Sequence, residues 1–250
     1  MINLAVVNQS TVVKDADASA MTTALQTQVS RDFFPVWGVD AKLTFLPKGK
    51  SVPAGSWVLA ILDNADQAGA LGYHDITPDG MPLGKVFAKT TLDDGGAVSV
   101  TASHELLEML GDPDINLTAE LDDATGRPAK FYAYEVCDAC EDDQFGYKIN
   151  GILVSDFVYP AYFESFRTAG STQFDFGNHV TAPFTLLAGG YISVLDLANL
   201  SQGWQQITPS RNDREARVKS RARIGSRRER RTISRERWIV SWYQQKAANA

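Results

Sequence analysis

The sequence contains only two cysteines among its 250 residues, Cys137 and Cys140. A structural zinc ion held by four cysteines of one chain is excluded, because such a site needs two C-x-x-C pairs. The single pair is compatible with two reduced thiols near the core or with a local disulfide. A redox role of the thioredoxin type is disfavoured, since no helix is predicted to follow Cys137.

Long apolar runs are also absent. No segment reaches the roughly 20 apolar residues that a membrane-spanning helix requires, so no membrane contact is expected. The first segment, Met1 to Asn8, has neither a basic stretch nor a cleavage site, and it predicts a buried strand and no secretory signal. A hydrophobic content of 44% is typical of a globular protein with a sizeable core.

Positive charge is scarce over most of the chain and concentrated in one stretch. Residues 211–237 hold 12 Lys and Arg against 4 Asp and Glu, a net charge of +8, whereas the remaining residues carry a net charge of −14. We therefore expect a domain over residues 1–209 and a basic arm over residues 210–250.

The basic arm has three alternative interpretations. It is a solvated segment that folds onto the acidic body, a contact to nucleic acid that neutralises phosphates through residues 211–237, or an element that inserts into a neighbouring subunit. The apolar patch from Trp238 to Tyr243 favours docking, because a solvated tail gains nothing by exposing two Trp and a Tyr. No nucleic-acid-binding motif accompanies the arm, so base-specific recognition is not expected.

Hydrophobic periodicity predicts an α/β (α+β) fold in which a mixed sheet packs on two helices. The first helix is expected over residues 15–34 and the second follows the glycines at 95–96. The part of the domain after residue 165 is expected to be β-rich and irregular. Strands are expected over residues 2–7, 41–46, 56–62, 70–76, 84–89 and 191–195, and a hairpin over residues 147–163.

The second helix carries the most informative motif of the chain. His104 and Glu108 lie four residues apart, so they face the same side of a helix, at the spacing with which one helix offers two ligands to a metal ion. Glu105 lies between them and would act on a metal-bound water. The helix is expected to start near Ser103 as its N-cap and to end at Gly111.

The motif is H-E-x-x-E and not the H-E-x-x-H of zinc peptidases. A carboxylate in place of the second imidazole adds negative charge and suits harder ions. The alternative interpretation is an ordinary amphipathic helix with a surface His–Glu pair.

The acidic segment 112–143 has two interpretations, a solvated loop region or an oxygen-rich calcium site, although it lacks the D-x-D-x-D-G pattern of calcium loops.

A second motif follows in Tyr134-Glu-Val-Cys-Asp-Ala-Cys-Glu141. The chain resembles the phosphate-induced, exordium-like family and its bacterial and phage relatives, which pair an H-E-x-x-E helix ending in Asp-Pro with a later Glu-x-x-Asp-x-Cys segment. The order of the expected elements over the first half of the chain resembles the zincin fold. The matching positions are His104, Glu105, Glu108, Asp112, Pro113, Glu135, Asp138 and Cys140.

The resemblance to zincins implies a metal site with a third ligand downstream of the helix. In the gluzincin arrangement this ligand is Glu135, and we predict the ligand set His104, Glu108 and Glu135. In the metzincin arrangement it is Asp114, which is disfavoured because no Met follows Met109 to form a Met turn. The expected metal is zinc, with calcium or manganese as alternatives, and absence of a metal is a further alternative.

Two carboxylates are expected to support these ligands from behind. Asp112 would hold His104 in one tautomer, and Asp138 would act beside Glu135. His179 is expected to be a lone structural histidine. His74 lies on an expected edge strand, where it is more often a satisfied histidine than a ligand, although it could contact an extended substrate.

Three functions follow from these features. The resemblance to phage proteins implies a virion-associated structural or assembly protein on a degenerate zincin-like scaffold, located in the virion or the host cytoplasm, with other subunits as partners. The first alternative is a metal-dependent peptidase in which Glu105 is the catalytic base. The second alternative is a protein that contacts nucleic acid through its basic arm.

Overall fold

The computed structural model describes residues 1–209 of the chain. The expected basic arm and its apolar patch, residues 210–250, lie outside the described residues. Among the helices of residues 1–209, none is long and apolar enough to cross a membrane.

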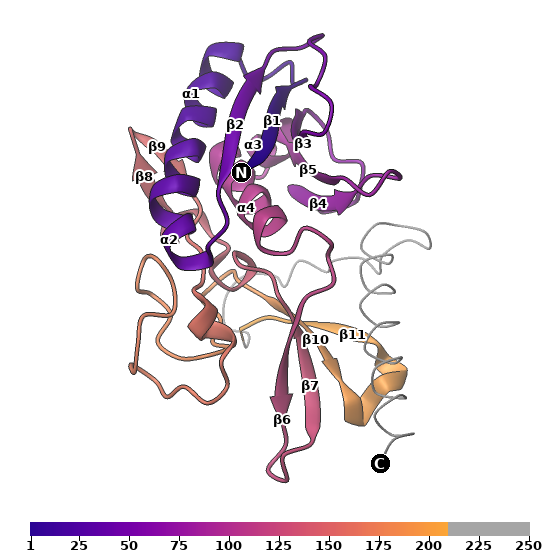
Figure 1. The fold of residues 1–250 in the computed structure, drawn as a ribbon, viewed down its shortest axis with the longest axis vertical. Coiled ribbons are helices and arrows are strands. Elements are labelled where there is room, and N and C mark those ends of the chain that lie inside the picture. The colour runs from indigo at the N-terminus through magenta and orange to yellow at the C-terminus, as the bar shows by residue number, and fades with distance from the viewer. Residues whose placement is uncertain (210–250) are drawn as a thin grey trace.

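A five-stranded sheet forms the upper part of the molecule in Figure 1. Its order is β2-β1-β3-β5-β4, with the first four strands parallel and β4 antiparallel to β5 at the edge. Strands β1 and β3 are almost continuous apolar runs, and β1 is buried from Leu4 to Asn8. The strands are β1 (Ile2–Asn8), β2 (Ala41–Leu46), β3 (Trp57–Leu62), β4 (Gly72–Ile76) and β5 (Pro82–Phe87).

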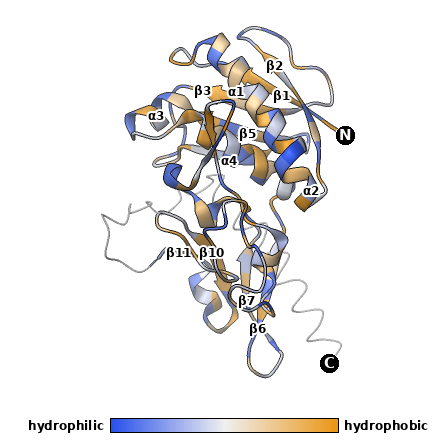
Figure 2. Cartoon of the chain, turned by 90° about the vertical axis from the view of Figure 1, so that its left-hand side faces the viewer, coloured by the Kyte–Doolittle hydropathy of each residue, from blue (hydrophilic) through white to orange (hydrophobic). Residues whose placement is uncertain are grey.

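Two helices pack on one face of this sheet. Helix α1 (Asp15–Thr27) continues as a π-helical segment, η1 (Gln28–Phe33), and as α2 (Phe34–Trp37), while helix α4 (Val98–Gly111) follows the short helix α3 (Ala88–Asp93). Leu4 and Val6 of β1 share one core cluster with apolar residues of α1 and α4. Hydrophobic residues accordingly predominate in the sheet and in α4 in Figure 2.

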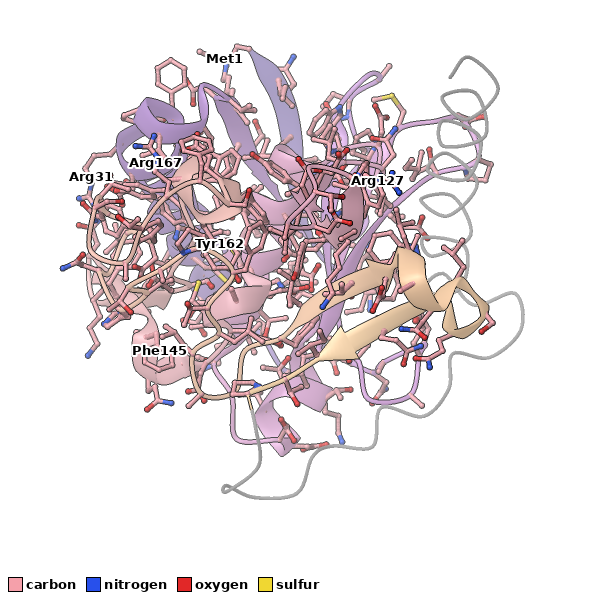
Figure 3. The ribbon with its side chains drawn as sticks, turned by 90° about the horizontal axis from the view of Figure 1, so that it is seen from below. Met1, Arg31, Arg127, Phe145, Tyr162 and Arg167 are labelled. Atoms are coloured by element: carbon pink, nitrogen blue, oxygen red, sulfur yellow. The ribbon has the colours of Figure 1, made fainter. Side chains whose placement is uncertain are left out.

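The remaining residues form a second, β-rich part, most of which lies below the first in Figure 1, while the hairpin of β8 and β9 lies beside α1. A four-stranded antiparallel sheet has the order β11-β10-β7-β6, and a separate hairpin, β8–β9, packs against α4. Buried aromatic side chains such as Tyr162, near the middle of Figure 3, fill its interior. The strands are β6 (Thr118–Asp122), β7 (Pro128–Ala133), β8 (Tyr147–Ile149), β9 (Ile152–Val154), β10 (Ile192–Asp196) and β11 (Trp204–Ile207).

Short 3-10 helices interrupt this second part at η2 (Asp138–Cys140), η3 (Asp143–Phe145), η4 (Pro160–Phe163) and η5 (Leu197–Gln202).

The sheets and helices together confirm the expected α/β class. Most of the expected strands are present within one or two residues of their predicted limits.

Three local expectations were wrong. The strand expected over residues 84–89 runs from Pro82 to Phe87, and α3 begins at Ala88. The acidic segment 112–143 is not a solvated loop region, because it contains β6 and β7. Helix α4 starts at Val98, so Ser103 is a buried residue within the helix and not its N-cap.

Ser103 instead joins α4 to two other elements through a closed set of buried hydrogen bonds. Its Oγ donates to Gln28 Oε1 at 2.7 Å and accepts from the N–H of Ser155 at 3.0 Å. The Gln28 amide closes the set by donating to the carbonyl of Ser155 at 2.9 Å. These bonds fix the position of α4 relative to η1 and to the segment that follows β9.

Replacing Ser103 by Ala is expected to lower the free energy of unfolding by about 2–4 kcal/mol, because a buried N–H and a buried amide oxygen each lose a partner. Urea denaturation measures this change. The matched control is Thr23→Ala, which removes an exposed hydroxyl that bonds to the carbonyl of Ser19 on α1. The control should change stability by no more than about 0.5 kcal/mol. Equal effects of the two substitutions would contradict the role of the network.

Candidate metal centre

Helix α4 brings three chemically active side chains into the interior. His104, Glu105 and Glu108 are all buried, although Glu and His are usually exposed on helices of this size. Their burial follows from the position of α4, which contacts β4 and β5 on one side and β9 on another. The expected surface His–Glu pair is therefore excluded.

Glycine at position 72 allows β4 to approach α4 closely. A Cβ atom at Gly72 would lie 2.7 Å from both Cγ and Oε1 of Glu105 and 2.9 Å from the carbonyl oxygen of Lys85. Such distances are shorter than van der Waals contact, so a larger residue there would displace Glu105. The glycine thus sets the position of the Glu105 carboxylate against the edge strand.

Strand β4 also contributes His74, which is fully buried. Its Nδ1 atom lies 3.5 Å from Glu108 Oε2 and 3.8 Å from Glu105 Oε2. Its Nε2 atom lies 3.8 Å from Glu135 Oε2. His74 therefore lies on an edge strand, as expected, but its side chain is buried inside the cluster of α4 carboxylates.

The segment after β7 supplies the remaining carboxylates, Glu135 and Asp138, both buried. Asp138 Oδ1 lies 3.3 Å from His104 Nε2, and Glu108 Oε1 lies 3.2 Å from the same nitrogen. The N–H of Cys137 lies 3.4 Å from Glu108 Oε1 and fixes this oxygen from the other side. Asp138 therefore faces Nε2 of His104 directly and does not stand behind the imidazole.

Two sets of possible ligands result, and they share Glu108. One set is His104, Glu108 and Asp138, and the other is His74, Glu108 and Glu135; within each set, one ligand atom per residue lies within 4.8 Å of the others. The predicted set of His104, Glu108 and Glu135 thus draws on both. The five residues of the two sets, together with Glu105, form what we call the α4 cluster: His74, His104, Glu105, Glu108, Glu135 and Asp138.

The two other acidic candidates, Asp112 and Asp114, belong to neither ligand set. Asp114 is exposed and belongs to none of the ligand sets found among residues 1–209, so the structure does not support the metzincin alternative. Both oxygens of Asp112 accept backbone N–H groups, from Asn116 at 3.0 Å and from Leu117 at 3.1 Å. Asp112 therefore shapes the loop that leaves α4.

Electrostatic coupling within the α4 cluster is strong because its groups are buried together. Burial alone would lower the pKa of His104, but the carboxylates of Glu108 and Asp138 outweigh it and raise this pKa well above its usual value. Burial and the charge of Glu108 raise the pKa of Asp138. Protons on His104 and Asp138 thus offset the negative charge of the cluster.

Glu105 differs from Glu108, the other buried carboxylate of α4, in its hydrogen bonding. Its Oε2 atom is buried and has no hydrogen-bond partner among the described residues. An ionised carboxylate oxygen in this position is costly unless a cation or a water molecule compensates it.

The two cysteines lie beside the cluster as free, buried thiols. Burial, together with the charge of Glu108, raises the pKa of the Cys137 thiol, and burial with the charge of Asp156 raises that of Cys140. Of the two alternatives for this pair, the structure shows reduced thiols. Both stay protonated and are therefore poor metal ligands here.

Tyr191 is a residue near the cluster that sequence reasoning missed. Burial, followed by the charge of Asp138, raises the pKa of its phenol, which also bonds to the Asp138 side chain. The phenol therefore stays protonated and donates. No sequence pattern identifies it, since it lies more than 50 residues after the Glu-x-x-Asp-x-Cys segment.

A separate buried network surrounds His179, which was expected to be alone. Its Nδ1 atom lies 3.1 Å from Asp156 Oδ2 and 3.4 Å from Asp175 Oδ2. The two carboxylates also accept N–H bonds from Phe157, Gly177, His179 and Val180. The lone-histidine expectation was wrong, but these backbone bonds support the expected structural role.

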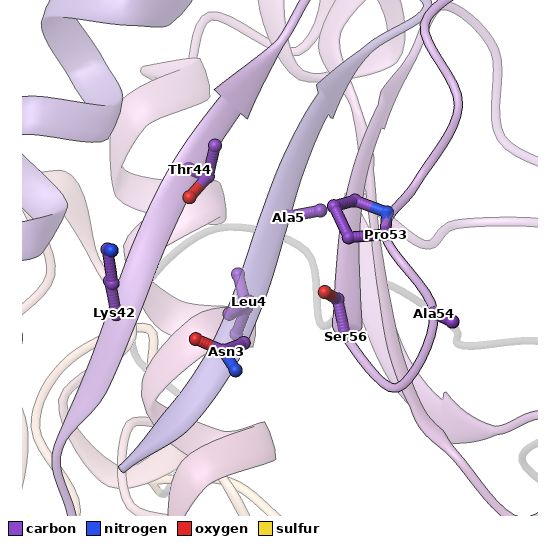
Figure 4. A pocket seen from close by; sticks show the side chains of 8 residues that line it. All are labelled: Asn3, Leu4, Ala5, Lys42, Thr44, Pro53, Ala54 and Ser56. Carbon is purple, nitrogen blue, oxygen red and sulfur yellow. The ribbon is translucent and has the colours of Figure 1, made fainter.

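A shallow hollow lies elsewhere, on the other face of the large sheet. Figure 4 shows its lining residues, which come from β1, β2 and the segment before β3, and its volume is about 270 Å³. Lys42 is the charged residue of this lining, which contains no His or carboxylate. The hollow therefore offers none of the chemistry found at the α4 cluster.

Comparison with known proteins identifies no relative: no protein-family description, curated protein or solved structure matches this chain.

The Asp156–Asp175 pair generates a prediction about pH. Burial and the hydrogen bond with Asp175 raise the pKa of Asp156 to about 7 from 3.8. Because the folded pKa is raised, this group's contribution to stability is complete below about pH 4 and is lost as pH rises through 7. Asp156→Asn removes the titration. The free energy of unfolding of the Asp156→Asn variant, minus that of the wild type, should therefore increase between pH 5 and 8 by up to about 1.4 kcal/mol per pH unit.

Urea denaturation at several pH values measures this difference. The control is Asp79→Asn, which changes an exposed carboxylate in the turn between β4 and β5. The free energy of unfolding of this control should change with pH in the same way as that of the wild type. A constant difference between Asp156→Asn and wild type over this pH range would disprove the raised pKa.

Proposed function

We propose that the α4 cluster binds divalent metal and that the protein is a metal-dependent hydrolase acting on peptide bonds. The observation that carries the proposal is Glu105 Oε2, a buried carboxylate oxygen without a hydrogen-bond partner among the described residues, beside a set of imidazole and carboxylate ligands. A water molecule on a bound metal ion would give this oxygen its partner.

The separations within the cluster support metal binding. Two ligand atoms bonded to one tetrahedral zinc ion at about 2.1 Å lie roughly 3.4 Å apart. The nitrogen–oxygen distances are 3.2 Å for His104–Glu108, 3.3 Å for His104–Asp138 and 3.5 Å for His74–Glu108. These distances exceed those of strong hydrogen bonds between charged groups and match the spacing of ligands around an ion.

The composition of the cluster supports zinc or manganese. Each ligand set contains an imidazole, and imidazole nitrogen is a common ligand of zinc, whereas calcium takes oxygen ligands. Carboxylates in the majority suit manganese as well. A zincin-like relationship stays part of this proposal and is supported by the order of strands and helices around α4.

Each residue of the site would have a separate role in peptide hydrolysis. The metal would polarise the substrate carbonyl and make its bound water more acidic. Glu105 would accept the proton of the attacking water and pass it to the leaving amine. The Tyr191 phenol, which stays protonated, is placed to donate near Asp138. Strand β4 is the last strand of its sheet and would align an extended peptide.

A purely structural role for the metal is the second candidate. The burial of the ligands supports it, since each of the six residues of the α4 cluster is at most 6% exposed and structural metal sites are closed. An ion there would join α4 to the segment after β7. The virion-associated assembly role rests on the resemblance to phage proteins and on residues 210–250. Nucleic-acid contact rests on residues 210–250, which lie outside the described residues, and both roles stay predictions.

Metal binding is expected to stabilise the protein. At a zinc or manganese concentration about 100 times the dissociation constant, the free energy of unfolding should rise by about 2.7 kcal/mol, which raises the melting temperature by roughly 5–10 °C. Differential scanning fluorimetry with and without a chelator measures this shift. Asp138→Asn should reduce it, whereas Asp79→Asn should not. An unchanged melting temperature in the presence of both metals would refute the metal centre.

The catalytic role of Glu105 separates the two candidates. Glu105→Gln keeps the shape of the side chain but removes the base, so cleavage of a peptide library should fall by about 100-fold or more. Metal binding by this variant should remain within a few-fold of wild type. The structural candidate predicts instead that neither protein cleaves peptides while both are stabilised by metal. Equal cleavage by both proteins would eliminate Glu105 as the base.

A further inference from the structure

We infer that the α4 cluster is a dinuclear centre, in which Glu108 bridges two divalent ions. This inference rests on the proposed metal binding and specifies how many ions the site holds. It concerns the two ligand sets that share Glu108, and it assigns His74 on β4 as a metal ligand.

Glu108 directs its two oxygens at different imidazoles. Oε1 lies 3.2 Å from His104 Nε2, and Oε2 lies 3.5 Å from His74 Nδ1. A carboxylate between two ions binds one ion with each oxygen, and metal pairs of this kind are about 3.5–4 Å apart. A single ion held by Oε1 of Glu108 would use only one of the two ligand sets, while Oε2 lies beside the imidazole of the other set.

Each half of the cluster is a complete set of protein ligands. The first ion would be held by His104, Asp138 and Oε1 of Glu108, from α4 and η2. The second would be held by His74, Glu135 and Oε2 of Glu108, from β4 and the segment after β7. Three protein ligands for each ion leave a coordination position for water or substrate, as catalytic sites require.

Charge balance favours two ions over one. With ions bound, the protons on His104 and Asp138 would be displaced, because metal ligands bind in their deprotonated form. Glu105, Glu108, Glu135 and Asp138 would then carry four negative charges, and the neutral imidazoles would add none. One divalent ion would leave an excess of two negative charges among buried groups, whereas two divalent ions neutralise all four carboxylates. Burial of uncompensated charge is costly, so neutrality is the stable arrangement.

The network of Asp156, Asp175 and His179 provides the internal control. It also satisfies the spacing of a metal site, but its carboxylates already accept backbone N–H bonds and His179 is partly exposed. We therefore assign no ion to it. None of its three residues belongs to the α4 cluster, so residues of the network and of the cluster can be substituted independently.

The experiment counts ions in the full-length protein. After equilibrium dialysis against zinc or manganese, elemental analysis should find two ions per chain. His74→Asn and Asp138→Asn should each leave one ion, and His179→Asn should leave two. Glu135→Gln, an isosteric change, replaces His74→Asn if that variant does not fold, and it too should leave one ion. The manganese form should give the electron paramagnetic resonance signal of a spin-coupled pair.

The other outcomes decide against specific statements. One ion in wild type overturns the dinuclear centre but leaves the proposed function intact, while no ion in wild type overturns both. Loss of an ion in His179→Asn shows that the second ion lies at the other network and overturns the assignment. Retention of two ions, or loss of both, in His74→Asn and Glu135→Gln contradicts two separable ligand sets.

Discussion

The carboxylate of Glu108 couples the parts of this protein that matter most for its chemistry. It is buried within reach of His104 on its own helix, of His74 on β4 and of the N–H of Cys137 after β7. Two histidines lower the pKa of Glu108 well below its usual value, against the opposing effect of burial. The helix, the edge strand and the following segment must therefore keep their relative positions for this charge to remain tolerable inside the protein.

The rest of the fold holds α4 in that position. The large sheet supports it on one face, and Gly72 lets the edge strand come close. The bonds of Ser103 with Gln28 and Ser155 attach its other side to η1 and to the end of β9. Buried polar networks that are fully satisfied specify one arrangement of the elements they join, and here that arrangement aligns the side chains of the α4 cluster.

The sequence was informative where the physical cause is local. The pairing of His104 with Glu108 follows from helical geometry alone, and the strands follow from apolar runs. The start of α4 was not predicted, because Val98, Val100 and Thr101 are β-branched residues with low intrinsic helix propensity, and tertiary burial decides their conformation. The position of His74 depends on the pairing of β4 with β5 and on its distance from α4, which no local pattern records.

The buried state of Cys137 and Cys140 has a practical consequence. They are the only cysteines of the whole sequence, and both thiols are enclosed and held in their unreactive, protonated form. A cysteine introduced at an exposed position would then be the one thiol that reacts readily with maleimide or nitroxide reagents. Spectroscopic probes can therefore be attached at chosen points of this fold without first deleting the native cysteines.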